Sequence, residues 1–185
     1  MDTATDFDIK PTIAAGFDLK GLKTWNTDDG GGYQFTLTHA GKPVAEVTND
    51  GHGGPVNVRW MNLRWDGSIY IPSDVTPVQR KKLEAQAALS SAAKSALDGI
   101  LAATPRVTTE WGGDPLTVDA GWVMGSLVDF AELRKLCVKK TVFRPVGKDA
   151  DLVIKAPYDA KVKAYIESKY PGATIYNETF GASAA

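Results

Sequence analysis

The chain has 185 residues, of which 43% are hydrophobic and 23% charged, and its net charge is −1. These values are ordinary for a folded globular protein and exclude an intrinsically disordered chain. A nearly neutral net charge also gives no overall attraction to nucleic acid or to a membrane surface. The charge is unevenly spread, because residues 1–75 hold six Lys/Arg against ten Asp/Glu and the remainder is positive.

The cysteine content and the hydropathy pattern indicate where in the cell the protein is expected. Cys137 is the only cysteine, which excludes an intrachain disulfide and fits a reducing cytoplasm. No apolar run reaches the roughly 20 residues that a membrane-spanning helix needs. The first residues also lack the basic and then apolar pattern of a secretion signal. We therefore expect a cytoplasmic protein that does not contact a membrane.

The first part of the chain has the pattern of a β-meander. Residues 1–16 are predicted to be a flexible or edge arm. Short apolar–polar alternations of period two, typical of half-buried strands, then occupy residues 17–25, 33–39, 43–48 and 56–60. Because short turns separate them, they predict an antiparallel β-meander over residues 17–71, with a further short strand at 68–71.

A helix is predicted from residue 76 to about 103. Thr76 is a good N-cap, Pro77 suits the first helical position, and Gln79 can complete a capping box. Pro105 prevents further helix. Apolar residues at helical spacing predict that one face packs on the sheet; they are Leu89, Ala92, Ala93, Ala96, Leu97, Ile100 and Leu101.

After a break at 112–115, a second helix is expected over residues 119–139. Its apolar residues cover more than one stripe, which predicts a more buried helix. The tail then predicts two strands, a helix and a strand at 141–144, 152–155, 159–170 and 173–176. Strands first and helices later predict an α+β fold. We expect a single domain over 17–178, made of a meander (17–71), a helical part (76–140) and a ββαβ tail (141–178), followed by a frayed end at 179–185.

Small and polar residues form a loop between two predicted strands; this glycine loop consists of Asn49, Asp50, Gly51, His52, Gly53 and Gly54. Such a loop is either a plain turn or a place where backbone N–H groups approach a ligand. Phosphate-binding loops normally lead into a helix, but here Pro55 and a strand follow, which leaves only a backbone nest. A nucleotide or other phosphate ligand is thus one alternative. Basic residues that could assist are Arg134, Lys135, Lys139, Lys140, Arg144 and Lys148.

No complete catalytic or metal-binding signature is present. Asp50 and His52 are two potential zinc ligands, and His39 could approach from the neighbouring strand, but zinc needs three or four protein ligands. Cys137 with His52 and Asp50 supplies residue types for nucleophilic catalysis, although a lone cysteine in an apolar helix usually behaves as a small hydrophobe. We predict no catalytic residue, metal or cofactor. A hydrolase that uses Asp50 and His52 stays an alternative.

A cation–aromatic pair occurs twice after the glycine loop, as Arg59-Trp60 and Arg64-Trp65. Aromatic side chains with flanking arginine suit stacking on unpaired bases. The same residue types are enriched at the centres of protein–protein interfaces. Since the net charge is nearly neutral, we favour a protein partner. The predicted binding surface is the glycine loop together with these four residues.

Two segments carry a resemblance to a group of viral proteins. The turn at 40–42, the strand ending at Thr48 and the Asn-Asp-Gly-His-Gly-Gly loop, with a segment at 133–143 downstream, resemble small uncharacterised proteins encoded by bacteriophages and prophages. The resemblance implies an accessory factor in the bacterial host cytoplasm. It implies action by binding, either to inhibit or redirect a host protein such as a defence component, or to sequester a nucleotide signal. It assigns no catalytic residue.

Overall fold

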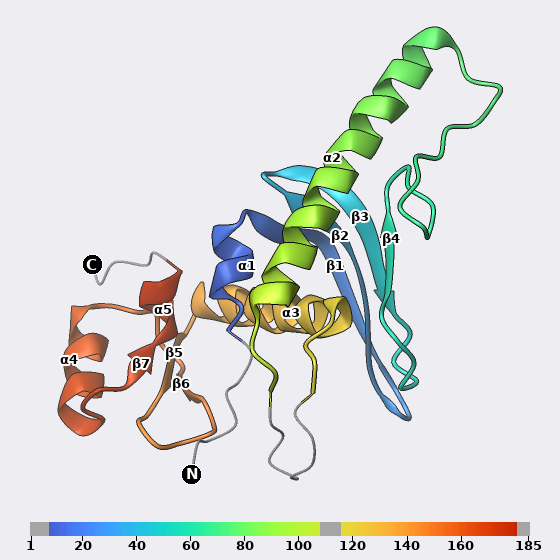
Figure 1. Cartoon of the computed structure of the whole chain (residues 1–185). Helices are drawn as coiled ribbons and strands as arrows, with labels where there is room; N and C mark the ends of the chain where they lie inside the picture. The colour runs from blue at the N-terminus through green and yellow to red at the C-terminus, as the bar shows by residue number, and fades with distance from the viewer. Residues whose placement is uncertain (1–7, 108–115, 181–185) are drawn as a thin grey trace. The chain divides into compact units, whose positions relative to one another are not determined.

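A computed structural model describes residues 8–107 and 116–180 (Figure 1). The predicted α+β class is confirmed, because an antiparallel four-stranded sheet is followed by helices and by a second, three-stranded sheet. The chain divides into two compact units, Met1–Val128 and Asp129–Ala185. That residues 17–178 fold as one cooperative domain stays a prediction. The expected break at 112–115 lies outside the described residues.

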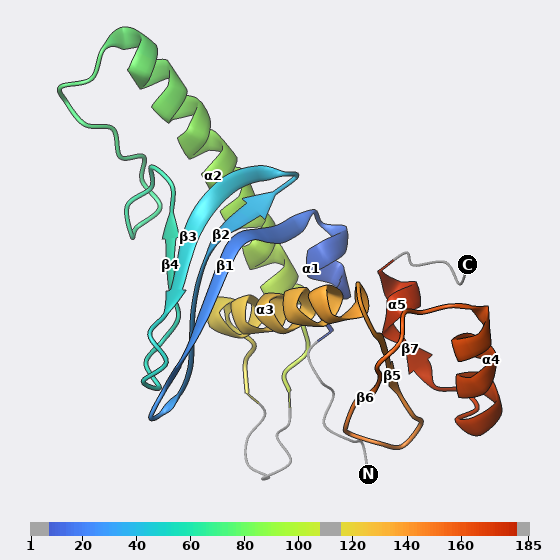
Figure 2. The ribbon, with the colours of Figure 1, turned by 180° about the vertical axis from the view of Figure 1, so that it is seen from behind.

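The first sheet contains four strands in the order of the chain. Each strand pairs antiparallel with the next, which confirms the β-meander, and Figure 2 shows the strands side by side. Their bounds are β1 Phe17–Thr27, β2 Gly30–His39, β3 Lys42–Asn49 and β4 Asn57–Trp60. The alternation of apolar and polar residues was therefore sufficient to predict the topology, apart from one or two residues at the ends of most strands.

Two predictions for this unit were wrong. The strand expected at 68–71 does not form; Ile69 makes only an isolated bridge with Leu63, within a hairpin. The segment expected as an arm contains a short helix, α1 (Lys10–Ala14), in which Pro11 occupies one of the first two positions. A five-residue helix is too short to show a helical period in the sequence.

The core of the first unit lies between the sheet and the helices. Inward side chains of the first three strands are buried, namely Phe17, Leu19, Tyr33, Phe35, Leu37, Val44, Ala45 and Val47. Helix α2 (Pro77–Ala103) packs on this sheet near β3. There Ser90 Oγ donates to the carbonyl oxygen of Val44 at 2.9 Å, and Gln86 Nε2 donates to that of Pro43 at 2.8 Å.

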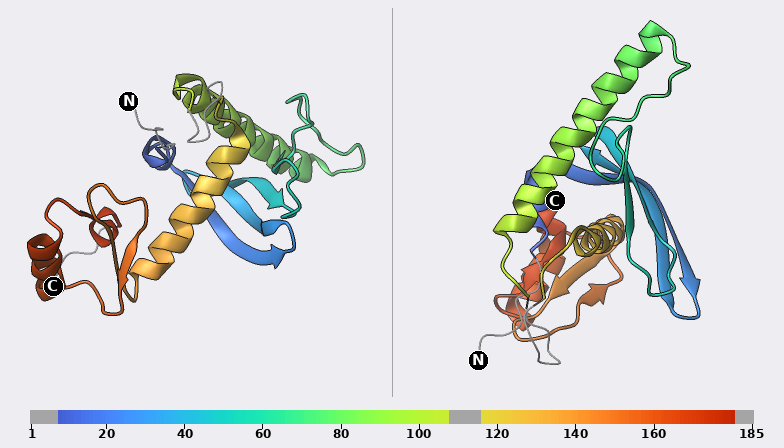
Figure 3. Two further views of the ribbon diagram at one scale, coloured as in Figure 1. Left: turned by 90° about the horizontal axis from the view of Figure 1, so that it is seen from below. Right: turned by 45° about the vertical axis from the view of Figure 1, so that its right-hand side comes forward.

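Helix α2 begins with the predicted capping box. The Gln79 backbone N–H donates to Thr76 Oγ1 at 3.3 Å, and the Thr76 backbone N–H donates to Gln79 Oε1 at 2.9 Å. The first turns of the helix extend past the sheet (Figure 3), and most of their side chains are exposed. The predicted buried stripe was too broad, since Leu89 and Ala92 are exposed. The helix buries a narrower face made of Ala87, Ser90, Ala93 and Leu97.

Helix α3 (Ala120–Cys137) contains the boundary between the two units. Its first half is strongly buried, as predicted, with Val123, Met124, Leu127 and Val128 all inaccessible or nearly so. Gly121 allows a close approach to the segment before β4, because a Cβ there would lie 3.3 Å from the side chain of Val56. Among the described residues, no helix combines the length and the hydropathy needed to cross a bilayer.

The second unit is built around a small antiparallel sheet of order β6-β5-β7. Its elements are β5 Thr141–Arg144, β6 Leu152–Ile154, α4 Ala160–Lys169, β7 Thr174–Ile175 and α5 Tyr176–Thr179. The predicted strands and helix are confirmed, whereas α5 was not predicted, because four residues carry no period. Most of the expected frayed end, residues 181–185, lies outside the described residues. The core consists of Phe143, Tyr158, Ile166 and Ile175.

A buried asparagine ties this unit together. Asn177 Oδ1 accepts a hydrogen bond from the Val142 N–H at 2.9 Å. Its Nδ2 donates to the carbonyl oxygens of Cys137 at 2.9 Å and Lys140 at 2.8 Å. Because the side chain is fully buried, these bonds compensate for the loss of solvation. The end of α3, β5 and α5 are thus joined through one side chain.

Candidate functional site

The glycine loop is a tightly bent segment that follows β3. Asn49 Oδ1 accepts from the Gly51 N–H at 2.8 Å, and Asp50 Oδ1 accepts from the His52 N–H at 2.9 Å. These successive side-chain-to-backbone turns fix the direction of the chain. Gly51 is buried, with a φ of +84°, and a Cβ there would lie 2.7 Å from the Gly32 nitrogen. Glycine at position 51 is therefore a structural requirement.

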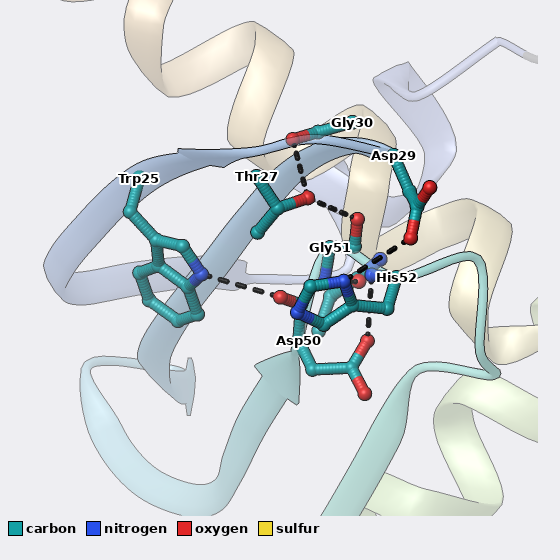
Figure 4. Close-up of polar contacts among 8 residues, drawn as sticks. Trp25, Thr27, Asp29, Gly30, Asp50, Gly51 and His52 are labelled. Carbon is teal, nitrogen blue, oxygen red and sulfur yellow. Dashed lines mark hydrogen bonds and ion pairs between the residues drawn. The ribbon is translucent and has the colours of Figure 1, made fainter.

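The loop is held against the turn between β1 and β2 (Figure 4). Trp25 Nε1 donates to the Asp50 carbonyl oxygen at 3.2 Å. The Thr27 hydroxyl lies 2.5 Å from the Gly51 carbonyl oxygen and 3.0 Å from that of Gly30, and can donate to either. Asp50, His52, Gly53 and Gly54 are exposed, so the loop is accessible to solvent while these hydrogen bonds hold it in place.

The electrostatics of this turn do not favour an anionic ligand. His52 Nδ1 lies 3.3 Å from Asp29 Oδ2, and the neighbouring Asp28 and Asp50 are exposed carboxylates. The N–H groups of Gly51 and His52 already donate to side chains of the loop. The backbone nest considered for a phosphate therefore lacks the Gly51 donor and is surrounded by negative charge.

The residues considered for metal binding are not brought together, and the thiol considered for catalysis is disfavoured as a nucleophile. His39 packs its ring on Phe17, with centroids 4.7 Å apart, at the end of β2 near Lys42. His52 follows the opposite end of β3, so the two histidines lie apart. Burial raises the pKa of the Cys137 thiol, which disfavours the reactive thiolate. Within residues 8–107 and 116–180, no three His, Cys, Asp or Glu side chains are grouped to hold a metal ion.

The first cation–aromatic pair belongs to the sheet. Arg59 forms an ion pair with Glu46, which is its partner in the register of β3 and β4. Trp60 lies opposite Ala45 in the same ladder and is half-buried. Arg59 is therefore paired across the ladder while its side chain stays exposed, and Trp60 is partly covered.

The second pair lies in a hairpin after β4, which we call the Trp65 hairpin (residues 62–70). The Arg64 N–H donates to Ser68 O at 2.8 Å, and the Gly67 N–H donates to Arg64 O at 2.9 Å. Gly67 has a φ of +82°, so the turn has the geometry of a three-residue loop closed by a glycine bulge. Asp66 Oδ1 accepts from both the hydroxyl and the N–H of Ser68, which lowers the pKa of the Asp66 carboxyl. The turn is thus fixed by its own hydrogen bonds.

This hairpin presents a large aromatic side chain to solvent. Trp65 is 95% exposed, and Ile69 and Tyr70 are 55% and 48% exposed. The Arg64 guanidinium carbon lies 5.6 Å from the centre of the Tyr70 ring, which is a cation–π distance. One cation and three large apolar groups therefore lie on one short, hydrogen-bonded hairpin.

The structure separates the two parts of the predicted binding surface. Thr48 pairs with Asn57 and Ala45 pairs with Trp60, so the glycine loop lies at one end of β4 and the Trp65 hairpin lies beyond the other. The views from both sides agree (Figures 1 and 2). The loop and the aromatic pairs are close in the sequence, and the sequence interpretation therefore placed them on one surface. The extended strand β4 instead holds them apart. The sequence interpretation also overlooked Arg80, Lys81 and Lys82, three consecutive cations in the first two turns of α2.

Comparison with known proteins gives no further assignment: no family model, curated protein or solved structure matches this chain.

Proposed function

We propose that this chain is a binding protein that contacts a partner protein through the Trp65 hairpin. The observation that carries the proposal is the 95% exposure of Trp65 on a turn that is fixed by hydrogen bonds. A tryptophan side chain buries roughly 150–250 Å² when it enters a pocket, so leaving it in water is unfavourable. The occupant that fits is a protein surface with an apolar pocket for the indole.

The surroundings of Trp65 support this function. Tryptophan, tyrosine and arginine are the residues most enriched among those that dominate binding energy at protein interfaces, and the hairpin offers all three. Because the turn is already ordered, binding would cost less conformational entropy than the ordering of a flexible loop. The glycine loop has no part in this proposal, since its geometry is explained by its contacts with the β1–β2 turn.

Stacking on single-stranded nucleic acid is the second candidate, favoured only by the exposed indole. Arg59, which was expected to contribute, has an acidic partner beside it in Glu46, which offsets its attraction for phosphate. The Asp66 carboxylate lies next to Trp65 in the chain and, like any exposed aspartate, is charged at neutral pH, so it would repel a phosphate backbone. The protein partner is therefore the better proposal.

The identity of the partner depends on the viral resemblance. That resemblance implies a bacterial host protein, such as a defence component, which the chain would inhibit or redirect. The phage origin, the host cytoplasm and the sequestering of a nucleotide signal all stay predictions.

The test compares Trp65→Ala with a matched control, Tyr165→Ala, which removes an exposed aromatic ring of the second unit. Partners captured from a bacterial lysate are identified, purified and titrated by calorimetry. Trp65→Ala should weaken binding by about 2 kcal/mol or more, roughly thirtyfold. Tyr165→Ala should bind as the unchanged protein does.

The melting temperature decides how a loss of binding is interpreted. Because Trp65 is exposed, Trp65→Ala should leave the melting temperature almost unchanged. Equal affinity of Trp65→Ala and the unchanged protein for each purified partner would overturn the proposal. Loss of single-stranded oligonucleotide binding by the same variant would support the nucleic-acid candidate instead.

A further inference from the structure

Strand β6 (Leu152–Ile154) lies at the edge of the small sheet in the second unit. The order β6-β5-β7 leaves its outer side without a partner strand in the part of the chain that the structure describes. All three residues of β6 are apolar, and Leu152 and Val153 are 39% and 45% exposed. Edge strands are usually protected by a charge, a proline or a bulge, and β6 contains none of these. Its outer side is therefore open to a further strand.

The hydrogen bond of Asn177 shows which backbone groups face this edge. Asn177 follows β7, and its Oδ1 accepts from the Val142 N–H at 2.9 Å, so the backbone groups of Val142 face away from β6. Val142 pairs with Val153 in the regular ladder of β5 and β6. Because antiparallel pairs alternate between bonded and non-bonded, the N–H and the carbonyl of Val153 point to the outer edge. Among the described residues, none forms a hydrogen bond with them.

A groove of about 380 Å³ lies beside the start of β6. It is bounded by the turn between β5 and β6 and by the end of α4, and its apolar lining comes from Pro145, Val146, Ala150, Leu152, Tyr170 and Pro171. Leu152 pairs with the core residue Phe143, so its side chain lies on the face of the sheet that α4 covers. A strand added to the edge would place the residue opposite Leu152 on this same face, next to the groove.

Two lysines line the same groove and determine which charge suits an occupant. Lys148 belongs to the turn between β5 and β6, and Lys169 lies in the last turn of α4. Within residues 8–107 and 116–180, neither lysine has an acidic partner at ion-pair distance. Of the nearby acids, Asp151 is paired with Arg144 at 2.8 Å, and Asp149 does not line the groove. The groove therefore favours an acidic side chain next to an apolar one.

We propose that β6 and this groove bind an extended, acidic segment of a partner protein, which adds a strand to the small sheet. The backbone of the segment pairs with the outward N–H and carbonyl of Val153, and the groove takes an apolar and an acidic side chain. A three-residue strand offers few backbone bonds, so the groove must contribute and we expect a micromolar Kd. This site belongs to the second unit, and the Trp65 hairpin belongs to the first.

Hydrogen exchange of the free protein tests the open edge. NMR on the full chain should show a fast Val153 amide between the amides of Leu152 and Ile154, which donate to β5 and should exchange about tenfold more slowly. An equally protected Val153 amide at low protein concentration would mean that the edge is already covered, and would overturn the proposal. Protection that grows with protein concentration would identify a second copy as the occupant, and would overturn it too.

A random-peptide display library, selected on the immobilised full chain, supplies the probe. The selected peptides should alternate apolar and polar residues and be enriched in aspartate and glutamate. A synthetic copy should slow exchange of the Val153 amide. N-methylation of one alternate set of its backbone nitrogens should abolish binding, because that set faces β6, and methylation of the other set should be tolerated. A library that yields no peptide above the bare support would overturn the proposal.

Substitutions at the edge test the backbone contact. Val153→Pro removes the outward N–H without breaking a bond to β5, and should weaken peptide binding about tenfold or more. The control, Val153→Thr, keeps the N–H and the branched side chain and should bind normally. Melting temperatures show whether both variants fold; if Val153→Pro does not, the methylated peptides decide. Equal peptide affinity of a folded Val153→Pro and the unchanged protein would contradict strand addition.

Charge reversal tests the groove. Lys169→Glu should weaken binding of the acidic peptide by roughly tenfold and reduce its dependence on salt. The control, Lys161→Glu, changes an exposed lysine in the first turn of α4, outside the groove, and should bind normally. Trp65→Ala should also bind the peptide normally, even where it has lost the partner of the hairpin. Peptide binding that depends on Trp65, or that Lys169→Glu leaves unchanged, would refute the assignment to this groove.

Discussion

Gly51 and Gly53 lie two residues apart in the glycine loop and have similar φ angles, of +84° and +73°. A Cβ at Gly51 would collide with backbone atoms of Gly31 and Gly32 at the start of β2, whereas one at Gly53 would meet no atom within 4 Å. Both positions favour glycine because of the left-handed backbone. Only at position 51 would a side chain also collide with neighbouring atoms. The glycines of this loop are therefore required for more than one physical reason.

This difference gives a prediction at the scale of single residues. Gly53→Ala should lower the free energy of unfolding by about 1 kcal/mol, through backbone strain alone. Gly51→Ala should lower it by roughly 3 kcal/mol or more, because backbone atoms must also move. Urea unfolding measures both variants. Equal losses for the two would show that the contact between the loop and the β1–β2 turn does not hold Gly51.

At the scale of elements, the two halves of α2 are stabilised by different interactions. Hydrogen bonds from Gln86 and Ser90 fix its middle to β3. The turns from Pro77 to Ala85 extend past the sheet, where the capping box and a hydrogen bond of 3.5 Å from Asn62 Nδ2 to the Leu83 carbonyl hold them. Local interactions at the helix end therefore decide the stability of this half.

Removal of the cap should act locally. Thr76→Ala deletes the acceptor for the Gln79 N–H and weakens the first turns by about 1 kcal/mol. Hydrogen exchange of residues 79–82 should accelerate severalfold, while the urea midpoint of the whole protein should barely change. Thr76→Ser keeps the hydroxyl and should retain slow exchange. An unchanged exchange rate in Thr76→Ala would show that the helix end is stabilised by something other than its cap.

The elements that could be predicted from the sequence are those with a long or chemically marked pattern. Period-two alternation predicted β1 to β4, and Thr76, Pro77 and Gln79 predicted the start of α2. The short helices α1 and α5 carry no such pattern. The buried face of α2 was overestimated, because a stripe of alanines does not show which of its residues meet a neighbour.

The candidate site was harder to predict, because it depends on geometry across strands. The sequence identified Trp65 and the glycine loop as accessible. It could not show that Arg59 is occupied by Glu46, or that the two parts of the surface lie at opposite ends of β4. Both facts follow from the register between β3 and β4, which is a property of the pairing and not of either segment alone.

At the scale of the whole molecule, the chain contains two units with separate cores. Phe143, Ile166 and Ile175 are buried within the second unit, while Leu37 and Val47 are buried in the first. Each unit has its own buried residues, so a cavity made in one core should destabilise mainly the unit that contains it. Local stability can therefore differ between the units.

A cavity in one core should be detected mainly in that unit. Phe143→Ala should cost about 3–5 kcal/mol and accelerate hydrogen exchange in residues 141–177. Strands β2 and β3 should keep their protection. The reciprocal variant, Leu37→Ala, should affect the strands and spare residues 141–177. If either variant removed protection evenly from both units, the chain would be a single cooperative domain.

The exposure of Trp65 also has an optical consequence. Of the tryptophans that the structure describes, Trp65 has by far the greatest contact with water, since Trp25 is 37% exposed and Trp60 and Trp122 are more covered. An indole in water emits at longer wavelengths than one in an apolar pocket, so excitation at the red edge should select Trp65. The molecule therefore contains its own fluorophore at the proposed contact, and docking of a partner should be visible as a blue shift without any label.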